Sequence, residues 1–230
     1  MSEKTLTIDV SELTPRETNT QIRKAIDHDK IDTINLKNPN AMHYLINGIV
    51  GEGNIIVDGS AGYFAASMID KPHVKINGNA GWFVGDNMTN GEIIVEGSAG
   101  DGAGQGIYGG TVVVKKSVGS RTGEIMKNGT VIVGGDSGFM SGIFMMGGRI
   151  IILGNVGEDA AESIVNGVMY VRGKVESLGK NAYQMKVNEE DKKELKELLT
   201  KYEFDIPDED YDKFKKIIPH SKRPFFHKKD

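Results

Sequence analysis

A motif of the form apolar–x–Gly–x–small–Gly returns every 19 residues through the central part of this chain. The residues at its middle position are Gly59, Gly78, Gly97, Lys116, Gly135, Gly154 and Gly173. Repetition at one fixed period indicates a structural unit that is stacked on itself. Fold and function must therefore be inferred from the whole array, because no single copy of the motif stands alone.

Each copy of the motif also predicts a short strand. Apolar residues stand four and two places before the middle position, which gives two inward-facing side chains per strand. Asn-Gly or Gly-Gly precedes most of these strands, and both dipeptides suit a sharp corner because they tolerate positive φ. A unit of this length cannot bury its apolar side alone, so we expect coils stacked at about 4.8 Å.

The expected fold is thus mainly β: a single-stranded parallel β-helix with 19-residue coils and short helices at both ends. We expect it to be right-handed, because parallel crossover connections are almost always right-handed. The pattern divides the chain into an N-terminal strand and helix cap over 1–40, the β-helix over 41–182, and a C-terminal helical cap with a basic tail over 183–230.

Capping signals place the expected helices. Thr14, Pro15 and Glu17 form the start of a helix with a capping box. Asn188 and the acidic residues after it start a second helix, whose apolar face carries leucines and Tyr202. A third short helix is expected from Pro207 through Ile217.

Composition excludes several classes of protein. The net charge of −4 offers no basic stripe for nucleic acid. The chain has no Cys, so it supplies no thiolate to zinc or to an iron–sulfur cluster, and it fits a reducing compartment. The sequence shows neither a signal peptide nor an apolar run of about 18 residues that would span a membrane. We therefore expect a cytoplasmic protein.

Two apparent site motifs and the five histidines have simpler explanations than a functional site. Gly104–Gly109 matches the dinucleotide-binding pattern GxGxxG, but strand-forming residues follow it where a helix is required. Gly135-Asp136-Ser137-Gly138 resembles the nucleophile segment of trypsin-like proteases, yet it is in phase with the repeat and no His has matching context. The histidines are scattered without ligand spacing, at His28, His43, His73, His220 and His227. We expect no catalytic residue, no cofactor-binding residue and no metal ligand in this chain.

A strip of outward-facing residues is the candidate interface. The residue between the two inward positions of each strand is Ile56, Lys75, Ile94, Val113, Ile132, Ile151 and Tyr170 in turn. All except Lys75 are apolar or aromatic, and contiguous exposed apolar surface usually marks an interaction site. Two explanations remain open: a partner chain covers the strip, or the terminal helices of this chain pack over it.

The repeats resemble a known family. Phased copies of Ile-x-Val-x-Gly-x-Ala-Gly, with Gly-Gly-Thr-Val or Asn-Gly-Thr-Val between them, look like the GXGXG domain over roughly 41–182. This domain is the C-terminal β-helix of the glutamate synthase large subunit, and it recurs in one of the subunits of formylmethanofuran dehydrogenase. The segments 9–19, 120–123, 134–138 and 171–179 look most like stand-alone proteins of the glutamate synthase domain 3 type. Such proteins are the third piece of an archaeal split glutamate synthase, or the equivalent subunit of methylamine-glutamate N-methyltransferase.

The resemblance implies a role in nitrogen metabolism through partners. It implies a non-catalytic β-helix that braces a class II glutamine amidotransferase subunit against an FMN and iron–sulfur synthase subunit. FMN and the iron–sulfur cluster are then expected in the partner and none in this chain. Alternatives are a protein like the GXGXG subunit of formylmethanofuran dehydrogenase and an independent hydrolase or ligand-binding β-helix. Self-association of the isolated chain is left open.

Overall fold

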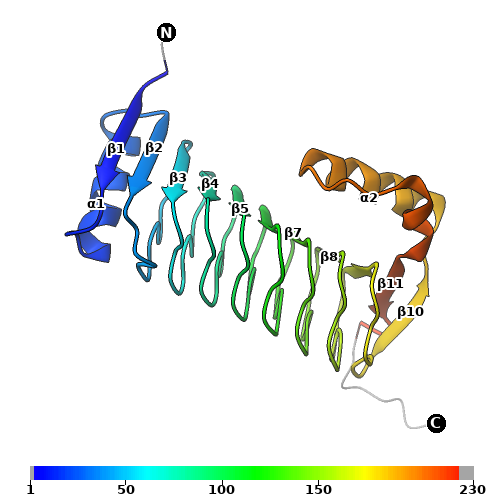
Figure 1. The fold of residues 1–230 in the computed structure, drawn as a ribbon. Coiled ribbons are helices and arrows are strands. Elements are labelled where there is room, and N and C mark those ends of the chain that lie inside the picture. The colour runs from blue at the N-terminus through cyan, green and yellow to red at the C-terminus, as the bar shows by residue number, and fades with distance from the viewer. Residues whose placement is uncertain (1–2, 223–230) are drawn as a thin grey trace.

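Eleven strands form one continuous sheet along the length of the computed structural model, which describes residues 3–222 (Figure 1). The strands of the array are β1 (Thr5–Asp9), β2 (Thr33–Lys37), β3 (Asn54–Asp58), β4 (His73–Ile76), β5 (Glu92–Val95), β6 (Thr111–Val114), β7 (Thr130–Val133), β8 (Arg149–Ile152) and β9 (Val168–Val171). Each pairs in parallel with the next. The predicted parallel β-helix is confirmed, while its right-handed sense stays a prediction.

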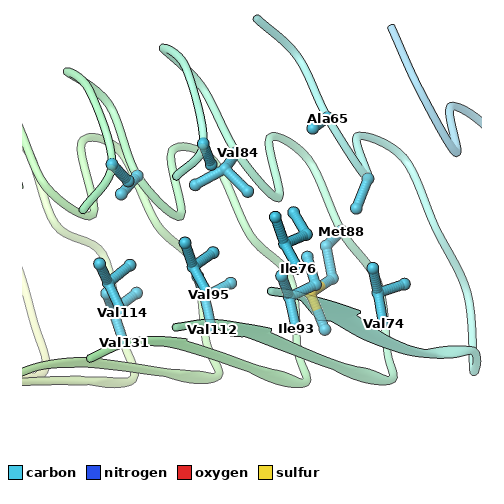
Figure 2. Packing of buried hydrophobic residues seen from close by; sticks show 14 of the residues in the cluster. Ala65, Val74, Ile76, Val84, Met88, Ile93, Val95, Val112, Val114 and Val131 are labelled. Carbon is cyan, nitrogen blue, oxygen red and sulfur yellow. The ribbon is translucent and has the colours of Figure 1, made fainter. Parts of the chain in front are cut away.

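The core fills the inside of the coils with columns of like residues. From β3 to β9 the register pairs each inward residue with its counterpart one coil on, as in Ile93 with Val112 and Val95 with Val114. Figure 2 shows Ala65 pointing from the opposite side of the coil toward the strand residues. All five of these side chains are fully buried. Small residues are used on that opposite side because the coil is narrow.

That opposite side, which we call the second wall, has an unusual backbone. In the coil of Tyr63 to Met68, every second residue has positive φ: Phe64 at +56°, Ala66 at +52° and Met68 at +54°. The amide of Phe64 donates to the Trp82 carbonyl of the next coil, and that of Ala66 to the Leu45 carbonyl of the preceding one, both at 2.8 Å. Because successive amides of this wall donate in turn to the next and to the preceding coil, each coil is hydrogen-bonded to both of its neighbours. The sequence pattern did not predict this conformation.

The N-terminal end of the array is closed by α1 (Pro15–Asp27) (Figure 1). Thr14 and Glu17 form the predicted capping box. Ile22 and Ile26 are buried and belong to the same core as the coils. The helix therefore covers apolar side chains that the first coil would otherwise expose to water.

The C-terminal end corrects the prediction for Pro207 through Ile217. After β10 (Ala182–Lys186) and α2 (Glu189–Lys201), the chain forms a 3₁₀ helix, η1 (Asp208–Lys213), and then β11 (Lys215–Pro219). β11 lies between β9 and β10 and is antiparallel to both. Ile217 is fully buried against the coil interior. A strand forms here because the last coil has a free edge to pair and an open end to fill.

Candidate interaction surface

Five of the six repeat glycines stand where a Cβ atom would come within 3 Å of the backbone of the preceding coil: Gly78, Gly97, Gly135, Gly154 and Gly173. At the sixth, Gly59, φ is +143° and the nearest atom would be in the Pro39 ring, at 3.0 Å. A Cβ atom on Gly97 would lie 2.7 Å from the carbonyl oxygen of Gly78, and one on Gly154 would lie 2.5 Å from the carbonyl carbon of Gly135. Real Cβ atoms do not approach backbone this closely, so these glycines serve stacking. Lys116 holds the same place with its amide 3.2 Å from the Gly97 carbonyl, and its side chain is exposed.

Most of the residues that follow the middle position of the repeat form polar ladders along the stack. The hydroxyl of Ser117 accepts from the amide of Asp136 at 3.0 Å, and the carboxylate of Asp136 accepts from the amide of Asn155 at 2.6 Å. The amide of Lys174 donates to the Asn155 side chain in the same way, at 2.9 Å. Asp136 is therefore part of the stacking, which explains the protease-like sequence around it.

Ser137 lies inside the coil in a cluster of hydroxyl groups. It is 5% exposed, and its Oγ is 2.8 Å from Thr122 Oγ1 and 2.7 Å from Ser141 Oγ. The Ser141 hydroxyl donates in turn to the Gly138 carbonyl. The residues that surround Ser137 thus satisfy its hydroxyl, and no histidine is among its hydrogen-bond partners in the described structure.

The other apparent motifs are likewise parts of the array. Gly104 lies in the second wall at φ +69°, and a Cβ atom there would lie 2.5 Å from a methyl group of Val131. The strand β6 follows Gly109, so the segment is not followed by a helix. His28, His43, His73 and His220 are exposed, whereas His227 lies outside the described residues. Within residues 3–222, no group of three His, Asp or Glu residues has the arrangement of a metal site.

The outward strip is divided into a covered and an open half. α2 and η1 lie over the C-terminal coils (Figure 1) and bury Val113, Ile132, Ile151 and Tyr170 to 2% exposure or less. These four side chains form a second core with Leu195, Leu199, Tyr202, Tyr211 and Phe214. The expectation of an interface is corrected for the four covered residues, because this chain supplies their cover. Ile94 packs against the margin of this second core, whereas Ile56 lies beyond it, and both side chains are partly buried.

Two polar clusters hold α2 in place. Near its first turn, Asp191 accepts hydrogen bonds from the Tyr170 hydroxyl and the Lys216 ammonium, each at 2.6 Å. Burial favours the neutral acid, but hydrogen bonds from Asn188, Lys216 and Tyr170 lower the pKa of Asp191 below its ordinary value. Burial and the nearby Asp191 carboxylate raise the pKa of Tyr170.

The second cluster joins the end of α2 to β5. Glu92 accepts from the Tyr202 hydroxyl at 2.6 Å and from the Lys201 ammonium at 3.1 Å. Burial again opposes ionisation, yet these donors lower the pKa of Glu92. Because Lys201 and Tyr202 are the last residue of the helix and its cap, this contact marks where the covered half of the strip ends.

The open half of the strip lines a shallow apolar hollow of about 360 Å³. Ile56, Ile94 and the stem of Lys75 contribute to it, with His73 and Glu92 at its margin. A polar groove of about 660 Å³ adjoins it and shares His73 and Glu92, with Lys71 and Lys201 also among its lining residues. Apolar surface next to charged groups of both signs is typical of a protein interface, with a dry centre and a polar rim.

A second exposed surface, which sequence reasoning missed, consists of stacked rings on the first three coils. We call it the aromatic patch: His43, Tyr44, Tyr63, Phe64, Trp82 and Phe83. His43, Tyr63 and Trp82 form one stack with centroids 4.5 and 4.8 Å apart, and Tyr44, Phe64 and Phe83 form another at 5.4 and 4.9 Å. Tyr44, Tyr63 and Trp82 are 41–51% exposed. The sequence signal for this patch was a pair of adjacent ring residues that recurs once per coil in three successive coils.

The patch is confined to the N-terminal coils and carries a conformational cost. One coil further on, its two columns continue with Asp101 and Gly102. Tyr44, Phe64 and Phe83 have φ of +56°, +56° and +62°, where Gly102 has +69°. A left-handed conformation costs an L-residue about 1–2 kcal/mol. Of these three rings only that of Tyr44 is exposed, and the same column keeps positive φ beyond the patch at Arg121 and Met140, so this conformation belongs to the second wall as a whole.

A comparison with known protein families agrees with the stacked, glycine-containing coils that the structure shows. The sequence profile of the GXGXG motif family matches residues 4–217. The chain belongs to this family. The match extends on both sides of the 19-residue repeats and includes α1, α2 and the first three residues of β11. Among curated proteins, a sequence search finds no significant match.

No helix among the described residues is long and apolar enough to cross a membrane. The localisation suggested by the sequence, which is cytoplasmic, stays a prediction.

Proposed function

We propose that this chain is a scaffold subunit of a glutamate-synthase-like enzyme complex, in which it braces a glutamine amidotransferase subunit against an FMN and iron–sulfur synthase subunit. Membership of the GXGXG family supports a glutamate-synthase-related domain. The observation that carries the proposal is the pair of uncovered surfaces on the N-terminal coils: the open strip on the strand side and the aromatic patch at the second wall. Two separate surfaces on one stacked support suit a protein that contacts two partners.

The amidotransferase would supply ammonia from glutamine, and the flavin and cluster of the synthase subunit would supply the reducing chemistry. This chain would contribute position: the coils are hydrogen-bonded along their length, so the two surfaces keep a fixed separation. Tyr and Trp side chains dominate the energetics of many interfaces, which makes Tyr63 and Trp82 the expected anchors of one contact.

Affinity capture with the full chain tests this function. We expect the chain to retain a class II amidotransferase and an FMN and iron–sulfur protein. Trp82→Ala with Tyr63→Ala is expected to release one of them. Tyr108→Ala is the matched control, because Tyr108 is 53% exposed but lies outside the patch. Recovery of molybdopterin-type proteins would favour the formylmethanofuran dehydrogenase alternative. Catalytic turnover by the isolated chain that is lost in the Ser137→Ala variant would overturn the scaffold proposal.

A further inference from the structure

Within residues 3–222 the sheet ends in two strands that have a neighbour on one side only, β1 and β10, and the two edges differ in character. The exposed residues of β1 are Thr5, Thr7 and Asp9, whereas β10 exposes Tyr183 and Met185, at 47% and 41%, together with Gln184 and Lys186. A free edge with exposed apolar side chains is a template for another strand, and proteins usually blunt or cover such edges. β10 is therefore the edge that calls for a partner strand.

The ladder between β10 and β11 shows which backbone groups of β10 are open. The amide of His220 donates to the carbonyl of Asn181 at 2.8 Å. Hydrogen-bonded pairs alternate in an antiparallel ladder, so Tyr183 and Met185 also bond to β11. The amide and carbonyl groups of Gln184 and Lys186 consequently point to the open edge.

We propose that a second copy of this chain covers the edge by antiparallel pairing of β10 with β10 about a two-fold axis at Gln184. In this register Gln184 faces its own counterpart at a hydrogen-bonding position. Tyr183 meets Met185 of the other copy, which buries both side chains and places a sulfur against a ring. Lys186 meets Ala182, so no like charges stand opposite each other. The contact is isologous and closes as a dimer.

Charges beyond the strand favour the same register. Asn181 of one copy is placed opposite Val187 of the other, next to the acidic first turn of α2, where Glu189 and Glu190 are exposed. Reciprocal hydrogen bonds of 3.1 and 2.6 Å tie Ser221 to Asn181. Lys222 of each copy thus comes near the acidic turn of the other copy, once on each side of the axis.

Sedimentation velocity of the full chain, across the micromolar range, tests the proposal. We expect a dimer for the unmodified chain. Gln184→Lys and Gln184→Glu each place like charges opposite one another and are expected to give monomers with unchanged circular dichroism. An equimolar mixture of the two variants is expected to regain the dimer, because Lys then meets Glu. Gln21→Lys and Gln21→Glu, on the exposed face of α1, are matched controls that should leave the dimer intact.

A monomeric unmodified chain, a dimer that survives both Gln184 substitutions, or a mixture that stays monomeric would each overturn the two-fold pairing. Open-ended polymers would overturn it as well, because they would indicate contact between β10 and β1. The experiment needs no other protein. Its outcome is therefore independent of whether the proposed amidotransferase and synthase partners bind.

Discussion

Single glycines decide whether two coils can stack, and the decision depends on how closely the backbones approach. Gly119 illustrates the limiting case: a Cβ atom there would lie 2.8 Å from the amide nitrogen of Asp101 and would also strike the Asp101 carboxylate. Neither neighbour is free to move, because the same carboxylate accepts the amide of Ser120 at 2.8 Å. The φ of Gly119 is not positive, so any residue could adopt this backbone conformation. Glycine is required here because there is no space for a Cβ atom.

Gly119→Val is expected to lower the free energy of unfolding by roughly 3 kcal/mol or more, as overpacking against backbone cannot be relieved by side-chain repacking. Lys116→Gly, three residues earlier, should change it by only about 1 kcal/mol. Denaturant titrations followed by circular dichroism measure both. Equal losses in the two variants would contradict the role assigned to coil contact.

At the scale of an element, α2 is held by ionised groups whose pKa values folding has lowered. The folded pKa of Asp191 lies below its unfolded value. The stabilisation from this group is therefore fully present above an unfolded pKa of about 4 and is lost as the pH falls through the lower folded value. Glu92 acts in the same direction at the other end of the helix.

We expect the opening free energy of α2, measured by amide hydrogen exchange, to be constant from neutral pH down to about pH 5 and to fall below about pH 4. Asp191→Asn should lower it by about 1–3 kcal/mol at neutral pH, because the hydrogen bonds to a charged acceptor are weakened. The difference from the unmodified chain should shrink in acid. Glu190→Gln, at the exposed neighbour, should leave the profile unchanged.

For the whole molecule, the division of the outward strip decides which residues stabilise the fold and which are open to a partner. Ile132 is fully buried beneath the C-terminal elements, whereas Ile56 lines an open hollow. The two residues occupy equivalent strand positions. Their different surroundings come from how far α2, η1 and the residues next to them extend along the stack.

The same substitution at both positions tests this division. Ile132→Asp is expected to cost more than about 3 kcal/mol, because it buries an unpaired charge. Ile56→Asp should cost about 1 kcal/mol or less, since its carboxylate stays in contact with water. Thermal unfolding measures the stability of each variant. Similar melting temperatures would contradict the covered and open halves described here.

Much of the architecture could be predicted because its signals are local. Ile93 and Val95 alternate within one strand, and Thr14 and Glu17 form a capping box within one helical turn, so a short window of sequence contains each signal. The strand β11 could not be found this way. Its residues pair only because the last coil leaves an edge, and that edge is created by the chain far upstream.

The site was predicted less completely than the fold, for a related reason. Periodicity showed that Ile56 and Val113 point outward, but it cannot show what lies on the other side of them. The aromatic patch was present in the sequence as ring pairs in phase, yet Tyr63 and Trp82 form one surface only when the coils stack them 4.8 Å apart.

The sequence by itself determined the period of the coil, the inward columns, the glycines at the coil contacts and the starts of α1 and α2. Each of these depends on neighbours within about one repeat, where local sterics and burial are sufficient to fix the outcome. Only the tertiary structure decided the left-handed second wall, the antiparallel closure by β11 and the half of the strip that α2 covers. These features depend on which distant surfaces meet, because burying apolar area between them is what stabilises the arrangement.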